Sequence, residues 1–483
     1  MDQQRKEQVI DMKFQPVTAL QQGTDAAAVI VKADQAFQIP EPVLEEKFRK
    51  LVPEEMAVGH LQCREMRLPD GLTLLLIGYD EQSVQPLDSL RAVLRLAADR
   101  LLAMNAGHAL LCSDPSLSSA AALQTGVVFS EQLYRFNRYR TKPQKVSLHS
   151  LDFLGTCADE LAEGAVLGEC VNLARDLVNE PADVLTPDEL ARRCHTYGSL
   201  YGFSVEVLEE AQCRALGMNL YLAVAQGSRL PPRFIIMRYH GSESDPLALI
   251  GKGITYDTGG LHIKTSGMES MRFDMNGAAA VIGAMAAIAA RRLPCHVVGV
   301  VAACENAVGP GSYRNGDIIK SMHGKTVFVR NTDAEGRLTM ADAMTYCCQY
   351  VHPEKMIAAA GLTGSVCSFY GNVAAAALTT RQEMFDLLVS ASAVTGEKFV
   401  QMPVFEEYRA KLKTGYADID NAPAGDCSGI LAELFLDSFS MDIPFLHIDF
   451  GAMPFTNSPP PGQEIGATGF GVKSLYWFAK NSC

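Results

Sequence analysis

The sequence lacks the segments that direct a chain into or across a membrane. Residues 1–7 are charged and no apolar core follows them, unlike the start of a secretory leader. The longest run of small apolar residues, 277–290, is shorter than the roughly 20 residues that a membrane-spanning helix needs. We therefore expect a cytoplasmic protein with no membrane partner. The alternative is a protein whose targeting peptide was removed and is not part of this sequence.

Positive charge is also scarce. Lysine and arginine together number 42 against 55 acidic residues, which gives a net charge of −13 at pH 7. This balance argues against a general nucleic-acid binder and against a protein that binds anionic membrane surfaces. None of the 13 cysteines belongs to a Cys-x-x-Cys pair, so we expect buried free thiols in a reducing compartment.

Several common catalytic motifs are missing. None of the ten histidines begins His-Glu-x-x-His, and the Gly-x-Ser-x-Gly turn of serine hydrolases does not occur. Gly251 and Gly253 follow a strand-like run but lack the third glycine of a dinucleotide-binding loop, and no phosphate-binding Gly-x-x-x-x-Gly-Lys loop is present. Any catalytic chemistry must therefore come from another set of side chains.

The pattern of apolar residues predicts an α/β protein in two parts. We expect a small N-terminal α/β domain over residues 1–150, which opens with a polar lead-in over 1–25. A linker helix is expected over 151–180, where a helical pattern spans 152–178. A larger C-terminal domain over 181–483 should follow, with a mostly parallel central sheet flanked by helices. Within it, strands at 234–239 and 247–250 are predicted to be joined by a turn.

Residues 331–338 hold two acids, a base and a glycine between a strand-like run at 326–329 and a helical run at 338–351. On an extended segment, Asp333 and Glu335 point the same way and could hold a cation. The alternative is local: Asp333 caps the helix and Glu335 lies in its first turn.

A second cluster decides between these interpretations. Lys252 and Asp257 lie at the carboxyl end of a predicted strand, Lys264 follows, and Asp274 precedes an alanine-rich helix. Taken one by one, these are ordinary caps and solvated lysines. Gathered in one pocket, however, the four acids would repel one another, and two divalent cations, zinc or manganese, would resolve the conflict.

Residues 251–264 and 331–338 closely resemble the leucyl aminopeptidase family, the two-metal cytosolic exopeptidases also called M17 peptidases. Further matching stretches lie at 174–181, 315–319, 362–364 and 466–472. The resemblance extends from about residue 170 to the end of the chain, whereas the first 150 residues match only in general layout. It implies a metal-dependent aminopeptidase that releases leucine-like N-terminal residues from peptides, and it implies a homohexamer.

The resemblance also implies a role for individual residues. One metal would be bound by Asp257, Asp333 and Glu335, and the other by Lys252, Asp257, Asp274 and Glu335. Lys264 would remain charged and face the developing oxyanion. Arg337 would hold a bicarbonate ion that acts as general base. The residues implied to contact the substrate are Met271, Asn331 and Leu362.

This sequence departs from the family pattern at the rim of the site. Asn276 stands where glycine is common, and Gly361 replaces a threonine that is common beside the leucine. No implied metal ligand is lost, so an active enzyme with an altered side-chain preference is expected. The alternative is a catalytically weak or inactive relative with a structural or DNA-binding role, although the acidic composition argues against DNA binding.

Overall fold

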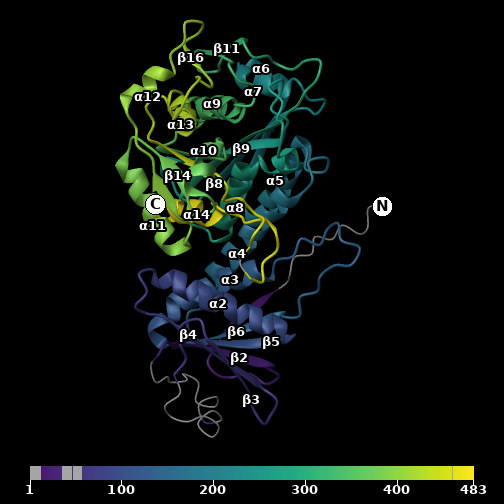
Figure 1. Ribbon diagram of the computed structural model, residues 1–483, viewed down its shortest axis with the longest axis vertical. Helices are drawn as coiled ribbons and strands as arrows, with labels where there is room; N and C mark the ends of the chain where they lie inside the picture. The colour runs from purple at the N-terminus through teal and green to yellow at the C-terminus, as the bar shows by residue number, and fades with distance from the viewer. Residues whose placement is uncertain (1–11, 35–45, 47–56, 460) are drawn as a thin grey trace. The chain divides into compact units, whose positions relative to one another are not determined.

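Two sheets organise the chain, and each belongs to a different compact unit of the computed structural model (Figure 1). The structure describes residues 12–34, 46, 57–459 and 461–483, so the first part of the predicted polar lead-in lies outside the described residues. One unit comprises Met1–Asn172 with Ser458–Ile465, and the other comprises Leu173–Asn457 with Gly466–Cys483. The break falls within a helix, α4 (Ala158–Asn179), and the domain boundaries at 150 and 180 remain predictions.

The N-terminal unit contains a six-stranded sheet that is parallel except at one edge. Helices α2 (Pro86–Ala103) and α3 (Ser118–Leu133) pack with this sheet around a buried apolar core. The strands, in their order across the sheet, are β1 (Lys13–Val17), β6 (Ser150–Leu154), β5 (His108–Ser113), β2 (Ala26–Lys32), β4 (Thr73–Tyr79) and the antiparallel β3 (Cys63–Arg67).

Two predictions for this region are wrong. The polar lead-in contains β1, and the helical pattern at 152–178 begins inside β6, because α4 starts only at Ala158. Only three side chains of β6 are buried, and one of them is the acidic Asp152, which pairs with His108 at 2.9 Å. So short a strand, interrupted by a charge, shows no clear two-residue period.

The second unit is built on an eight-stranded mixed sheet whose centre is parallel. Its strands, in order across the sheet, are β15 (Phe399–Gln401), β14 (Ala375–Leu378), β17 (Phe445–Asp449), β13 (Lys355–Ala360), β9 (Leu247–Asp257), β10 (His296–Asn306), β8 (Arg233–His240) and β7 (Ser204–Leu208). The two strands predicted to be joined by a turn, β8 and β9, are not neighbours. β10 lies between them, parallel to β9 and antiparallel to β8.

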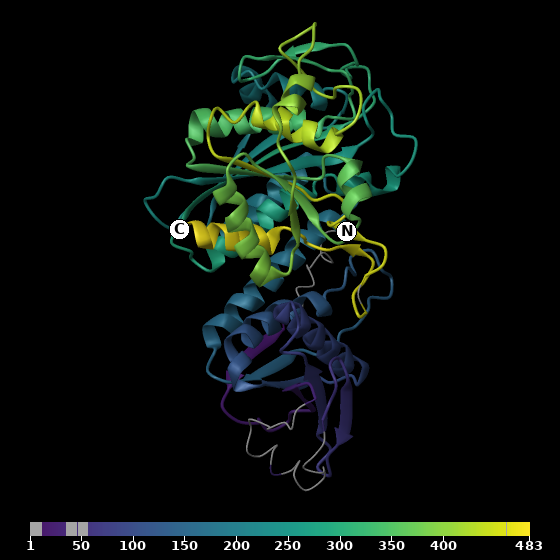
Figure 2. The same cartoon turned by 60° about the vertical axis from the view of Figure 1, so that its left-hand side comes forward.

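Helices cover both faces of this sheet (Figure 2). On one face, α8 (Asn276–Ala290) packs on β9 and β13, with α5 (Pro187–Tyr201) and α14 (Val472–Ser482) against it. A Cβ atom on Gly277 would lie 2.0 Å from the Ala359 carbonyl oxygen, so glycine lets α8 approach the strand closely. By length and composition the segment Met268–Ala290 could span a membrane, but 83% of the tested window is buried, as expected for a core helix.

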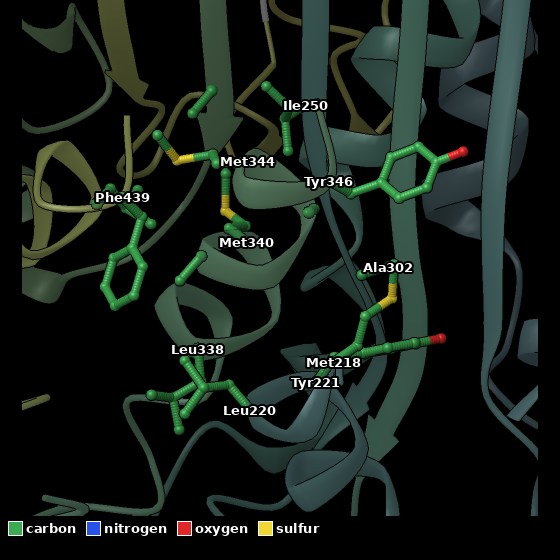
Figure 3. Close-up of a cluster of buried hydrophobic side chains, with 14 of the residues drawn as sticks. Met218, Leu220, Tyr221, Ile250, Ala302, Leu338, Met340, Met344, Tyr346 and Phe439 are labelled. Carbon is green, nitrogen blue, oxygen red and sulfur yellow. The ribbon is translucent and has the colours of Figure 1, made fainter. Parts of the chain in front are cut away.

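The opposite face is covered by α9 (Gly336–Tyr346), which packs on β9 and β10 together with α7 (Asn219–Ala225). Figure 3 shows the core at this contact, where Met340 and Met344 of α9 lie near Ile250 of β9. Further helices and short strands complete the unit: α6 (Glu210–Ala215), α10 (Gly364–Tyr370), α11 (Gln382–Thr395), α12 (Glu406–Lys411), α13 (Ser428–Asp437), β11 (Ile318–Lys320), β12 (Thr326–Phe328), β16 (Ile419–Asp420), β18 (Phe455–Thr456) and β19 (Gly466–Ala467).

Helix α5 contains a buried ion-pair network. Thr186 caps the start of the helix, and its hydroxyl accepts a hydrogen bond from the Glu189 backbone N–H at 3.2 Å. Arg193 Nη2 lies 2.6 Å from Glu180 Oε2, and Arg193 Nε lies 2.9 Å from Glu189 Oε1. Hydrogen bonds from Arg192 and Arg193 overcome the opposing effect of burial and lower the pKa of Glu189 to about 2.

Removing Arg193 should destabilise the protein much more than removing its neighbour Arg192. Arg193→Ala removes the guanidinium that lies 2.6 Å from the buried Glu180 carboxylate, and we expect a loss of about 3–5 kcal/mol in the free energy of unfolding. Arg192→Ala removes an exposed partner of Glu189 and should cost about 1 kcal/mol or less. Denaturant unfolding of both variants tests this, and equal losses would contradict it.

Candidate active site

The carboxyl ends of the central parallel strands form the edge where the predicted residues meet. Lys252 lies in the middle of β9 and Asp257 is its last residue. Five residues apart on a regular strand, their side chains would point to opposite faces. The register with β10 shifts at Thr255, which has no partner of its own, and one extra residue returns Asp257 to the face of Lys252. This bulge explains how both side chains reach one cavity.

The segment before α9 contributes two more acids, Asp333 and Glu335. It is not extended as predicted: Asp333 lies in a turn, and Glu335 has helical backbone angles at the cap position of α9. The alternative reading of Asp333 as the helix cap is therefore wrong. Asn331 fixes this turn, because its side-chain Oδ1 accepts a hydrogen bond from the Asp333 backbone N–H at 2.7 Å.

These segments surround an open cavity of about 820 Å³. Part of the lining is apolar and comes from Phe455 of β18 and Phe273, whose rings stack with centroids 4.0 Å apart. The other end of the cavity is strongly charged. The predicted site residues that line the cavity are Lys252, Asp257, Lys264, Met271, Asp274, Asp333, Glu335 and Leu362.

The two lysines are hydrogen bonded among the four acids. Lys252 Nζ lies 2.8 Å from Asp274 Oδ1 and 2.7 Å from Glu335 Oε1. Lys264 Nζ lies 2.9 Å from Asp257 Oδ2 and also contacts Asp333. Each lysine thus bridges two carboxylates, and each carboxylate is close to a cationic partner.

Burial and mutual repulsion perturb these groups. Burial, with the negative charge of Glu335, raises the pKa of Asp257 to about 6, and burial raises the pKa of Asp274 well above its usual value. Burial opposes the charged form of Lys252, yet the surrounding carboxylates prevail and raise its pKa. Four acids against two lysines leave a surplus of negative charge whenever all of them are ionised.

The donor set fits divalent cations. One oxygen each from Asp257, Asp274 and Glu335 lie within 4.8 Å of one another, close enough to share an ion. Asp274 Oδ2 and Glu335 Oε2 are buried and have no hydrogen-bond partner among the residues that the structure describes. Oxygen-rich clusters of this kind suit zinc and manganese, and a cation would occupy the unpartnered oxygens and balance the charge.

Arg337 and Asn331 lie outside the cavity lining. Arg337 is 5% exposed, and its Nη1 donates a hydrogen bond of 2.6 Å to the Asn421 carbonyl oxygen. Burial lowers the pKa of Arg337 to about 10, so the guanidinium stays charged at neutral pH. Its Nε is buried and has no hydrogen-bond partner among the described residues.

Two residues that support the site were missed in the sequence. Asn306 ends β10 and donates from Nδ2 to Asp257 Oδ1 at 2.8 Å. Asp449 ends β17 and accepts hydrogen bonds from the loop that contains Leu362. Both are polar residues at the carboxyl end of an apolar run on the expected edge of the sheet, and that position was the available signal.

Sequence comparisons find relatives over most of the chain. The sequence profile described as "Cytosol aminopeptidase family, catalytic domain" matches residues 172–476. A "Probable cytosol aminopeptidase" of Clostridium perfringens is 42% identical over 363 residues, which are 72% of this chain and 74% of that protein. "Leucine aminopeptidase 1" of Arabidopsis thaliana is 40% identical over 393 residues, 77% of this chain and 73% of that protein.

A solved structure also matches closely. The bottromycin maturation enzyme BotP in complex with Mn superposes with a TM-score of 0.85 at 27% sequence identity. The alignment covers 95% of this chain and 99% of that one. The α/β architecture predicted from the sequence is therefore confirmed.

Gly336 should tolerate no side chain, because Lys252 occupies the space. A Cβ atom there would lie 2.3 Å from Lys252 Cε, so Gly336→Ala must displace the lysine and should cost about 1–3 kcal/mol of stability. Gly364 is the matched control: it also begins a helix, and a Cβ atom there meets nothing within 4 Å. Thermal unfolding should separate the two variants, and equal melting temperatures would refute the packing argument.

Proposed function

Because the chain belongs to the cytosol aminopeptidase family and is a peptide-hydrolysing enzyme, we propose that it is a metal-dependent leucyl aminopeptidase with broad preference for the first residue. The observation that carries the proposal is the cluster of four carboxylates and two lysines that line one cavity, with Lys252, Asp257 and Glu335 buried. The cluster has a surplus of negative charge and two unpartnered oxygens, as a site for cations requires.

Two divalent ions per subunit, zinc or manganese, would be held by this cluster. Asp257, Asp333 and Glu335 would hold one ion, and Lys252 and Asp274 would hold the other together with Asp257 and Glu335. Bound ions of this kind supply Lewis acidity and make water a stronger nucleophile near neutral pH. Manganese in the BotP structure supports a divalent metal in this fold.

The chain's own side chains would orient the peptide and stabilise the charge that develops. The same cluster that would hold the ions would also bind the free α-amine of the substrate, which would select N-terminal residues. The pKa of Lys264 is raised, because neighbouring carboxylates outweigh the effect of burial, so its ammonium group stays protonated and can donate to the scissile oxygen as that oxygen gains charge. Met271 and Leu362 line the cavity and would contact the first side chain.

Arg337 and Asn331 would act from beside the cavity. The buried guanidinium of Arg337 would hold bicarbonate, the anion that supplies a general base. Asn331 would keep the Asp333 turn in place next to the substrate. No observation favours the alternative of an inactive relative with a structural or DNA-binding role.

Three further proposals rest on the resemblance and on the names of relatives. The catalytic domain would comprise residues 181–483, following an N-terminal domain over 1–150 and a linker over 151–180. The enzyme would act in the cytoplasm on peptides. It would assemble as a homohexamer, which a mass measurement by light scattering would test against the 52.3 kDa chain.

Metal removal should abolish turnover. With leucine anilide as substrate and manganese present, we expect hydrolysis that chelation lowers by at least about 100-fold and that added manganese restores. Asp333→Ala should remain nearly inactive at the same manganese concentration, because one ion loses a ligand. Turnover that survives chelation, or a fully active Asp333→Ala enzyme, would contradict the proposed mechanism.

A blocked amine should also prevent turnover. N-acetyl-leucine anilide has no basic nitrogen to place among the carboxylates, so its kcat/KM should be at least about 100-fold below that of leucine anilide. Parallel steady-state assays with the two substrates measure the ratio. Comparable rates would indicate an enzyme that does not select free N-termini.

A further inference from the structure

Asp449 lies beneath the loop formed by residues 361–363, which lines the cavity. It is the last residue of β17 and is 4% exposed. Its Oδ1 accepts hydrogen bonds from the backbone N–H groups of Gly451 at 3.0 Å and Leu362 at 3.3 Å, and its Oδ2 accepts one from the Thr363 hydroxyl at 3.2 Å. One buried carboxylate therefore holds together the loops that follow β13 and β17.

The same loop contacts Lys252. The Gly361 carbonyl oxygen accepts a hydrogen bond from Lys252 Nζ at 3.3 Å. Gly361 directly follows β13, and in the register of the sheet Ala360 of that strand is the partner of Asp449. A continuous chain of contacts thus leads from Asp449 through the 361–363 loop to the lysine amine.

We propose that Asp449 is a positioning residue, which fixes the 361–363 loop so that the Gly361 carbonyl sets the orientation of the Lys252 amine. The inference rests on the proposed function, because it assigns Asp449 a part in holding the metal. A lysine amine that binds a cation through its lone pair keeps two N–H bonds. A fixed acceptor for one of them determines where the lone pair points.

The competing explanation is that Asp449 only stabilises the fold. Asp342 of α9 provides a matched control, because it is equally buried and also accepts backbone hydrogen bonds, from Tyr221 at 3.0 Å and Met322 at 2.9 Å. It does not line the cavity. If Asp449 were purely structural, substituting either Asp449 or Asp342 would lower stability, and neither substitution would change metal binding.

The test is a calorimetric titration of the chelated full-length protein with Mn²⁺, which does not depend on activity. We expect Asp449→Ala to weaken the binding of one Mn²⁺ by about 10- to 100-fold. Asp449→Asn keeps an oxygen that can accept from the two backbone N–H groups, but its nitrogen cannot accept from the Thr363 hydroxyl. We expect this variant to weaken Mn²⁺ binding by at least about threefold, and by less than Asp449→Ala does. Asp342→Asn should lower the melting temperature and leave Mn²⁺ affinity unchanged.

Steady-state kinetics supply a second measurement. In Asp449→Ala the loss of kcat/KM should shrink as the Mn²⁺ concentration rises, because added metal refills the weakened site. Wild-type Mn²⁺ affinity in Asp449→Ala, or in Asp449→Asn if the alanine variant does not fold, would overturn the positioning role. If the wild-type protein binds no divalent ion, the proposed function fails instead, and the wild-type titration reveals this separately.

Discussion

Four carboxylates and two lysine amines share one cavity, and the balance of these charges is the constraint on which the site depends. Asp257 and Glu335 are each 2% exposed, so water screens their repulsion poorly. The acids cannot separate to relieve it. Asp257 is held in place by two uncharged donors, the Gly259 backbone N–H and Asn306 Nδ2, each at 2.8 Å. The negative charge must therefore be balanced inside the cavity, by protons or by cations.

The fold creates this concentration of charge by aligning the ends of apolar strands. β9, β10, β13 and β17 are almost wholly buried, and the acids appear only where these strands end or in the segments that follow. Glycine at 277 lets α8 pack closely on β13, so Asp274, just ahead of that helix, is brought next to Lys252. The bulge at Thr255 then aligns Asp257 with Lys252. Packing thus determines which charges meet.

Residues 251–264 and 331–338 could be recognised from the sequence because each gathers unusual residue types within one short segment. Asn306 and Asp449 carry a weaker signal, their position at the end of an apolar strand, because each acts on a residue far away in the chain, at separations of 49 and 87 positions. The same limit applies to the order of the strands, since nothing local in β8 or β9 reveals that β10 lies between them in the sheet. The bulge at Thr255 was likewise visible only through its pairing with β10.

Close packing around Lys252 explains how a flexible side chain can be held in one position. A free lysine side chain samples many rotamers, and ordering it costs up to about 2 kcal/mol. Here the absence of a side chain at Gly336 leaves a channel that the lysine fills, and the amine is held by Asp274, Glu335 and the Gly361 carbonyl. Most of that ordering is complete before any cation binds. Because the loop that presents Gly361 is itself tied to Asp449, the direction of the amine depends on β17 as well as on β9.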